Sequence, residues 1–331
     1  MNRRKWVIFV GLALISMVAA TGCPPRNEVP PPPNGAREEI DISALVEQWV
    51  ESAHSNILLL PAQRDNCVAC HDGGAFAGKL NEVAAIERDF FVSIDCRACH
   101  SGQGTELLAA GTIDLPTAEG VGGGSGAQCM ACHNSRRTPD INNPERPAPH
   151  YSSQADVFTA SGGLRAEGFD YGSTTAHSEL TNSCVDCHMV RGEGGFREHT
   201  FRIADVQAAC GQCHQNITTI NLPARSDYDG DGAQEGFQDE VTGLLSVLME
   251  AIGTATDGGS FASEGGRIQF TDAAGAPIAE VPNEVYQAAF NHLLVSQDGS
   301  LGVHNPIYTV QLLQQAYRVL TGNDVPNATM I

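Results

Sequence analysis

Aromatic side chains and positive charges are both scarce in this sequence. Of its 331 residues only 6% are aromatic, with 2 Trp, 6 Tyr and 12 Phe. A folded chain with so few large rings needs another source of bulk to fill its interior. Lys and Arg number 19 against 39 Asp and Glu, which gives a formal net charge of −20. Such a charge repels polyphosphates, so the composition excludes a nucleic-acid partner.

The N-terminal apolar run is shorter than a membrane span. Residues 6–20 are apolar and follow the basic residues 3–5, whereas a spanning helix needs about 20 residues. We therefore interpret residues 1–22 as an export signal. The segment ends in Ala-Thr-Gly-Cys23, which resembles a bacterial lipobox and predicts a lipid on Cys23. Ordinary secretion and an uncleaved anchor are the alternatives.

Prolines are concentrated in residues 23–40, which show no apolar periodicity. This composition predicts a stiff tether between a membrane and a folded body. No Asp follows Cys23, and by resemblance to the sorting rule for Gram-negative lipoproteins this favours the outer membrane. We expect an exported protein that is lipid-anchored there and faces the periplasm or the outer surface.

Ten of the 11 cysteines fall into five copies of one pattern, Cys-x-x-Cys-His. Two thiols three positions apart can add to the two vinyl groups of one haem, and the next residue then places an imidazole beneath the iron. Zinc is the main alternative, but five cysteine pairs leave one unused in Cys₄ sites, and zinc does not explain the constant histidine. The motifs predict five covalently bound haems c, attached through Cys67, Cys70, Cys96, Cys99, Cys129, Cys132, Cys184, Cys187, Cys210 and Cys213, with His71, His100, His133, His188 and His214 as proximal ligands.

The first cysteines of successive motifs are 29, 33, 55 and 26 positions apart. With so little chain between them, the haems must lie against one another and supply the missing bulk. We therefore expect a mainly α fold with much irregular loop, in which residues 41–222 form a haem-packed body.

Six histidines remain after the five motifs are counted. Five of them lie in segments that resemble distal-ligand segments of multihaem cytochromes, such as Gly-Val-His-Asn-Pro at residues 302–306. The sixth, His292, lies in a segment with helical apolar spacing and is expected to be a packed or surface residue. The resemblance implies that the distal iron ligands are His54, His150, His177, His199 and His304.

Residues 45–320 thus resemble pentahaem c-type cytochromes of the periplasmic and outer-membrane lipoprotein type, distantly related to the nitrite-reductase and extracellular multihaem cytochrome lineage. Two imidazoles on every iron imply an electron carrier, not an enzyme, with redox proteins bearing basic patches as partners. The catalytic haem of the multihaem nitrite reductases has Lys in place of the motif histidine, and no Cys-x-x-Cys-Lys occurs here. The alternatives are a reductase of nitrite, hydroxylamine or a sulfur oxyanion with one open haem, and a subunit of a conducting filament.

Residues 223–331 contain no haem motif. Asp227, Asp229, Asp231 and Glu235 alternate around glycines in a pattern similar to Ca²⁺ loops, although an EF-hand would have Glu where Gln238 stands. Glu240, slightly beyond this loop, could also serve as a ligand. A solvated turn is the alternative. Apolar periodicity predicts a helix after this loop, a small β-hairpin within residues 261–280, and two more helices, the last capped by Asn305. We expect this part to pack on the haem body.

Overall fold

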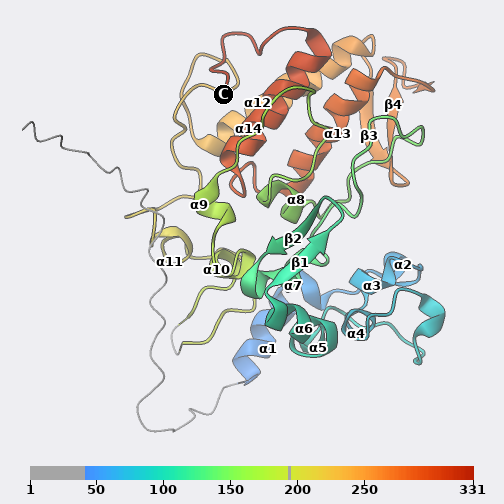
Figure 1. Ribbon diagram of the computed structural model, residues 1–331, viewed down its shortest axis with the longest axis vertical. Helices are drawn as coiled ribbons and strands as arrows, with labels where there is room; N and C mark the ends of the chain where they lie inside the picture. The colour runs from blue at the N-terminus through green and yellow to red at the C-terminus, as the bar shows by residue number, and fades with distance from the viewer. Residues whose placement is uncertain (1–41, 193–194) are drawn as a thin grey trace, which may run out of the picture.

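The computed structural model describes residues 42–192 and 195–331, so the predicted signal segment, the tether and Cys23 lie outside the described residues. Short helices joined by irregular loops make up the first two thirds of the chain, and long helices dominate the last third (Figure 1). The mainly α fold with much irregular loop is confirmed. The α-helices are α1 Ile42–Glu51, α2 Leu59–Ala62, α3 Val68–His71, α4 Gly73–Ala77, α5 Cys96–His100, α6 Gly102–Ala110, α7 Ala127–Met130, α8 Gln154–Phe158, α9 Thr175–Ser178, α10 Cys184–His188, α11 Val206–Cys210, α12 Phe237–Ala255, α13 Asn283–Asp298 and α14 Pro306–Thr321.

Two small antiparallel sheets accompany the helices. The predicted hairpin is present as β3 Ser260–Glu264 and β4 Arg267–Thr271, and a short third strand, β5 Pro277–Ile278, pairs with β4. A second hairpin, β1 Thr112–Leu115 and β2 Ala118–Gly122, was not predicted. Its strands are short and largely exposed, so they show little of the alternation by which a strand is recognised in a sequence. The described residues also form three 3₁₀ turns: Ala53–Ser55, Val83–Ala85 and Gly124–Gly126.

The last helix begins and ends as its sequence predicts. The side chain of Asn305 accepts a hydrogen bond from the backbone N–H of Tyr308, and Pro306 occupies the first turn, where its missing N–H costs nothing. Gly322 ends the helix in the left-handed conformation, with φ of 73°. This capped start fixes the position of His304, which lies immediately before it.

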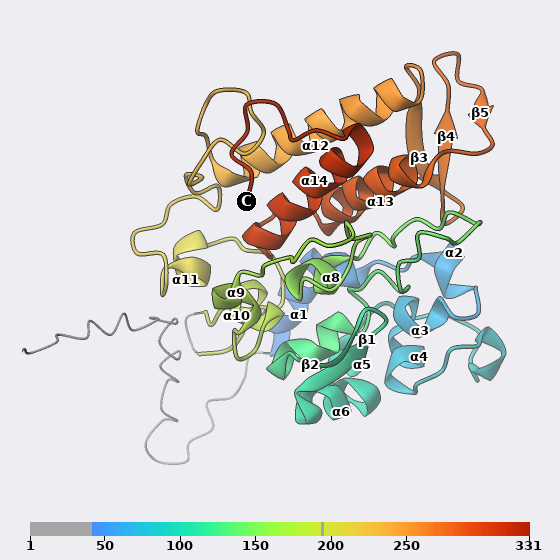
Figure 2. The ribbon, with the colours of Figure 1, turned by 45° about the horizontal axis from the view of Figure 1, so that its top comes forward.

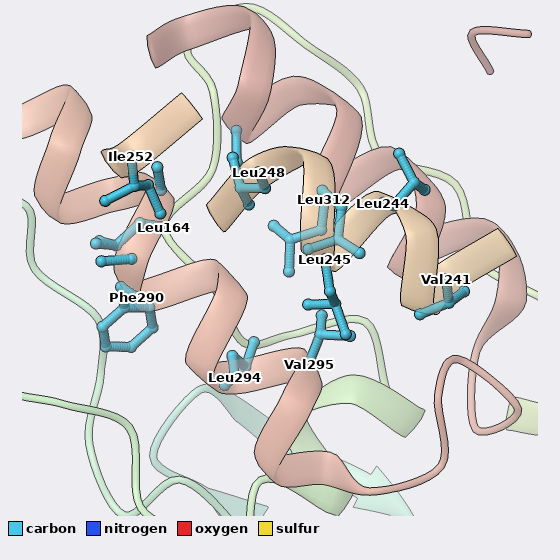
Figure 3. Close-up of a cluster of buried hydrophobic side chains, with 14 of the residues drawn as sticks. Leu164, Val241, Leu244, Leu245, Leu248, Ile252, Phe290, Leu294, Val295 and Leu312 are labelled. Atoms are coloured by element: carbon cyan, nitrogen blue, oxygen red, sulfur yellow. The ribbon is translucent and has the colours of Figure 1, made fainter. Parts of the chain in front are cut away.

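Helices α12, α13 and α14 pack side by side around the main hydrophobic core (Figures 1 and 2). Their facing sides contribute leucines and aromatic rings that are almost wholly buried, several of which are seen in Figure 3. Three residues from the part of the chain before residue 223, Ala148, Val157 and Leu164, belong to the same cluster. Helix α8 brings Val157 to this core, and so connects the C-terminal helices to the motif region below them.

The motif region has little core of its own. Its separate cluster contains only four buried residues, Leu115, Met130, Ala155 and Phe158. Large apolar side chains at 57–60 are exposed to solvent, with exposed fractions between 42% and 71%. Side-chain packing alone therefore gives this region much less stabilisation than it gives the C-terminal helices. Among the described residues, no helix is both long and apolar enough to cross a membrane.

Candidate haem sites

Each Cys-x-x-Cys-His motif forms or adjoins a single helical turn. In three of the motifs the backbone N–H of the histidine donates to the carbonyl of the first cysteine four residues earlier, at 3.1 Å for His71, 2.9 Å for His133 and 2.9 Å for His214. In the second and fourth motifs the same residues are helices α5 and α10. One helical turn places residues three and four positions apart on the same face, so both thiols and the imidazole of a motif are neighbours.

The cysteines of the first four motifs and Cys210 of the fifth are thiols, the form that thioether formation with haem requires.

The structure brings every motif histidine next to a second histidine from a distant part of the chain. These partners are the five histidines that the sequence analysis selected as distal ligands. We number the resulting sites 1 to 5 by motif. The ring centroids are 6.2 Å apart in site 1 (His71 and His150), 6.2 Å in site 2 (His100 and His199), 6.0 Å in site 3 (His133 and His54), 6.3 Å in site 4 (His188 and His304) and 6.4 Å in site 5 (His214 and His177).

This spacing is the one that a shared metal ion requires. Imidazole nitrogens bind metal ions at about 2.0–2.1 Å, so two imidazoles on opposite sides of one ion have ring centroids about 6 Å apart. The residues present therefore fit an iron porphyrin with one histidine on each face.

Burial keeps most of these imidazoles neutral, which is the form that binds metal. Burial, with the charge of His133, lowers the pKa of His54 to about 4. Burial, with Arg136 and neighbouring histidines, lowers the pKa of His150 to about 4. The pKa of His304 is raised instead: burial acts to lower it, but the hydrogen bond and charge of Asp298 outweigh burial.

Hydrogen bonds at Nδ1 orient six of the imidazoles and leave Nε2 for a metal. Five of the acceptors are neutral oxygen atoms. The sixth is the carboxylate of Asp298, which lies 2.5 Å from His304 Nδ1. The neutral partners are Gln154 for His133 (3.2 Å), Ser152 for His150 (2.7 Å), and the backbone carbonyls of Val303 for His177 (2.8 Å), Phe201 for His188 (3.0 Å) and Arg197 for His199 (2.9 Å).

Site 3 lies at the centre of the arrangement. The side chain of Cys132 interacts with that of Cys70 in motif 1, and the side chain of Cys129 interacts with that of Cys184 in motif 4. Gly126, just before motif 3, allows the close approach to motif 4, since a Cβ there would lie 2.0 Å from Ser183 Oγ.

Phe201, which the sequence analysis did not single out as a site residue, contacts three of the sites. Its ring centroid is 4.6 Å from that of His54 in site 3 and 6.0 Å from that of His199 in site 2, and its carbonyl accepts from His188 in site 4. Its backbone has φ of 57°, in the left-handed region. Only the position of Phe201 two residues after His199 hinted at this role in the sequence.

His292 takes part in none of the five histidine pairs. It lies on α13 in the C-terminal region, with its ring 5.2 Å from that of Phe261 and edge-on to it. Burial lowers its pKa to about 4. Within the described part of the chain, its Nδ1 is buried without a hydrogen-bond partner.

Of the predicted calcium ligands, the structure gathers Asp227 and Asp229 and adds Glu240. Each offers a carboxylate oxygen, and these oxygens lie within 4.8 Å of one another. Asp231 and Glu235, the other two predicted ligands, are not in this group. The Glu240 oxygens accept hydrogen bonds from the backbone N–H groups of Tyr228 and Glu235, at 2.6 and 3.0 Å.

Burial raises the pKa of Asp229. The surrounding carboxylates of Asp231, Glu240 and Asp227 raise it further, as expected for negative charges held close together.

Comparison with known proteins supports the haem assignment. Residues 164–325 match the family model of cytochrome c552. The crystal structure of the outer cell wall cytochrome OcwA aligns with a TM-score of 0.49 and 19% identity, over 83% of this chain and 50% of the other. The present chain thus spans about half the length of OcwA. No curated protein sequence matches the chain.

Residues 164–325 are thus similar to cytochrome c552, and the five repeated motifs are of the kind that attaches haem c covalently.

Proposed function

We propose that the protein transfers electrons through five haems c, each held between a motif histidine and a distal histidine. The observation that carries the proposal is the common separation of 6.0–6.4 Å in all five histidine pairs. Haem, when bound, supplies a one-electron iron couple. With imidazoles on both faces, no coordination position is left for a substrate.

The same pairs disfavour the two alternative functions. A reductase of nitrite, hydroxylamine or a sulfur oxyanion needs one iron with an open face, yet each motif histidine has a distal partner within the chain. A conducting filament held together by a distal histidine from a neighbouring subunit is also disfavoured. The chain itself supplies all five distal histidines, so no donated ligand is needed.

We further propose a branched order of electron exchange with site 3 at its centre. The cysteine side chains of site 3 lie beside those of sites 1 and 4, and Phe201 lies between sites 2 and 3. Sites 4 and 5 are neighbours through residues 303 and 304. The carbonyl of Val303 is hydrogen-bonded to His177 of site 5, and the next residue, His304, belongs to site 4. An electron entering at an outer site therefore passes site 3 or site 4 on its way.

We propose the domain division and the location from the sequence alone. We propose a haem body at residues 41–222, a C-terminal part at residues 223–331, and export with a lipid on Cys23 at the outer membrane. Removal of residues 1–22 takes away three positive charges, so the net charge becomes −20 − 3 = −23. This acidic surface favours basic patches on redox partners, with association that weakens at high salt.

The test of the main proposal is a haem count by pyridine haemochrome together with EPR of the oxidised protein. We expect five haems per chain, all low-spin. His304→Ala should convert one haem to high spin and leave four unchanged, because it removes one distal ligand.

His292→Ala is the matched control, since it removes a buried histidine that belongs to no pair, and it should leave the spectrum unchanged. A colourless protein, or a high-spin haem in the unaltered chain, would rule out the five-carrier proposal.

We also propose that Asp227, Asp229 and Glu240 bind Ca²⁺. Three carboxylates within 4.8 Å of one another repel, and a divalent cation would offset this repulsion. Chelation should then lower the melting temperature, and Asp229→Asn should abolish the response. An unchanged melt after chelation would show that the loop is a solvated turn.

A further inference from the structure

Asp298 provides the one charged Nδ1 partner among the hydrogen bonds described above. Its side chain is fully buried, and one carboxylate oxygen lies 2.5 Å from His304 Nδ1. His304 is the distal histidine of site 4, 6.3 Å from His188 between ring centroids. The opposite histidine of that site, His188, donates to a neutral carbonyl.

The position of Asp298 is costly for folding. It is the last residue of α13, a helix of 16 residues, and a negative charge at a helix C-terminus faces the negative end of the helix dipole. Burial of the carboxylate adds to this cost unless its oxygens are hydrogen-bonded. His304 and Ser300 supply those bonds: Ser300 donates both its hydroxyl and its backbone N–H to the oxygen that His304 leaves free.

Other contacts make the carboxylate rigid relative to site 4. Gln154 Nε2 donates to the backbone carbonyl of Asp298 at 3.1 Å, and the same side chain meets His133 of site 3 through its oxygen. The backbone N–H of His304 donates to Ser300 Oγ at 3.2 Å. Asp298, Ser300 and His304 thus form one closed network, which sets the orientation of the imidazole.

We propose that Asp298 is a positioning residue that lowers the midpoint potential of the haem held at site 4. The inference rests on the proposed function, because it requires haem between His188 and His304. A carboxylate on Nδ1 makes the imidazole a stronger electron donor at Nε2, and a stronger donor stabilises oxidised iron relative to reduced iron. The neutral oxygen atoms at the other five histidines give a weaker effect of the same kind.

The test is a potentiometric titration of the intact holoprotein, followed by optical and EPR spectroscopy. Asp298→Asn keeps the shape of the side chain and removes its charge. At a fixed potential we expect a tenfold fall in the oxidised-to-reduced ratio of one haem, which equals a rise of about 59 mV for a one-electron couple. Asp298→Glu keeps the negative charge, so the midpoint potential of this haem should stay close to that of the unaltered protein.

Asp186→Asn is the matched control, because Asp186 is also buried and lies inside motif 4 but is ion-paired with Arg197. This substitution should shift the midpoint potential of the same haem by less than half of the shift expected for Asp298→Asn. Ser300→Ala gives a second, opposite test. It removes a hydroxyl donor from the carboxylate, so Asp298 should accept more strongly from His304 and the potential of that haem should fall.

The outcomes separate this inference from the proposed function. Fewer than five haems, or a high-spin haem in the unaltered protein, would defeat the proposed function itself. Five low-spin haems whose potentials are the same in the Asp298→Asn variant, or shift equally, would overturn the role of Asp298. So would a rise in potential with Ser300→Ala.

Discussion

The C-terminal helices and the motif region differ in what fills their interiors. Helices α12, α13 and α14 have 19, 16 and 16 residues and bury one continuous set of leucines, valines and aromatic rings (Figure 3). The motif helices have four or five residues each, and the separate cluster beside them has four buried side chains. Helices this short are unstable without tertiary contacts, since nucleation is costly and few hydrogen bonds follow it. We therefore expect the motif region to depend on bound haem for its core, whereas the C-terminal region builds its core from side chains.

The largest effect is expected from removing haem at the centre of the motif region. Cys129→Ala with Cys132→Ala should abolish attachment at site 3, which touches sites 1 and 4, and the motif region should lose its protection against hydrogen exchange. Helices α12–α14 should stay protected, because their core consists of side chains. Mass spectrometry gives the haem number and the exchange pattern.

The matched control is Cys96→Ala with Cys99→Ala, which removes the attachment of haem at site 2, one of the outer sites. It should cost one haem and leave most of the motif region protected. If both double variants unfold the C-terminal helices equally, the two regions fold as one unit and the contrast between them is wrong.

A smaller effect is expected from a cavity in the C-terminal core. Leu248 on α12 is 1% exposed, and Leu248→Ala should destabilise the protein by about 2–5 kcal/mol. Denaturant unfolding followed by far-UV circular dichroism measures this loss. The haem spectrum at low denaturant should not change, and a lost or high-spin haem would show that this core also supports the iron sites.

The smallest effect concerns acid stability and His292. Burial lowers its pKa to about 4 in the native protein, against about 6.5 when unfolded. Between these values the unfolded chain binds more protons, so native stability falls as the pH drops from 6.5 to 4, by up to about 3 kcal/mol.

His292→Leu should remove this part of the pH dependence and leave the stability above pH 6.5 little changed. Thermal melts at pH 4.5 and pH 7.5 measure the difference. If the variant loses as much stability between pH 7.5 and pH 4.5 as the unaltered protein, other groups cause the loss.

Local features of the fold were predictable because they depend on neighbours in sequence. Asn305, Pro306 and Gly322 identify the start and end of α14 through capping and backbone preference alone. The hairpin β1–β2 was missed, since its strands are short and exposed. Glu240 was a candidate ligand outside the regular spacing of the calcium loop, and only the packing of α12 against that loop places it beside Asp227 and Asp229.

The sequence by itself determined the five motif turns and the histidines available to face them, since thiols and imidazole at i, i+3 and i+4 come together in any single helical turn. Only the tertiary structure decided which histidines meet. His54 reaches His133 across 79 positions and His304 reaches His188 across 116, and it is the capped start of α14 and the end of α13 that bring His304 and Asp298 together. No local pattern encodes such contacts, because they arise from how separate elements pack.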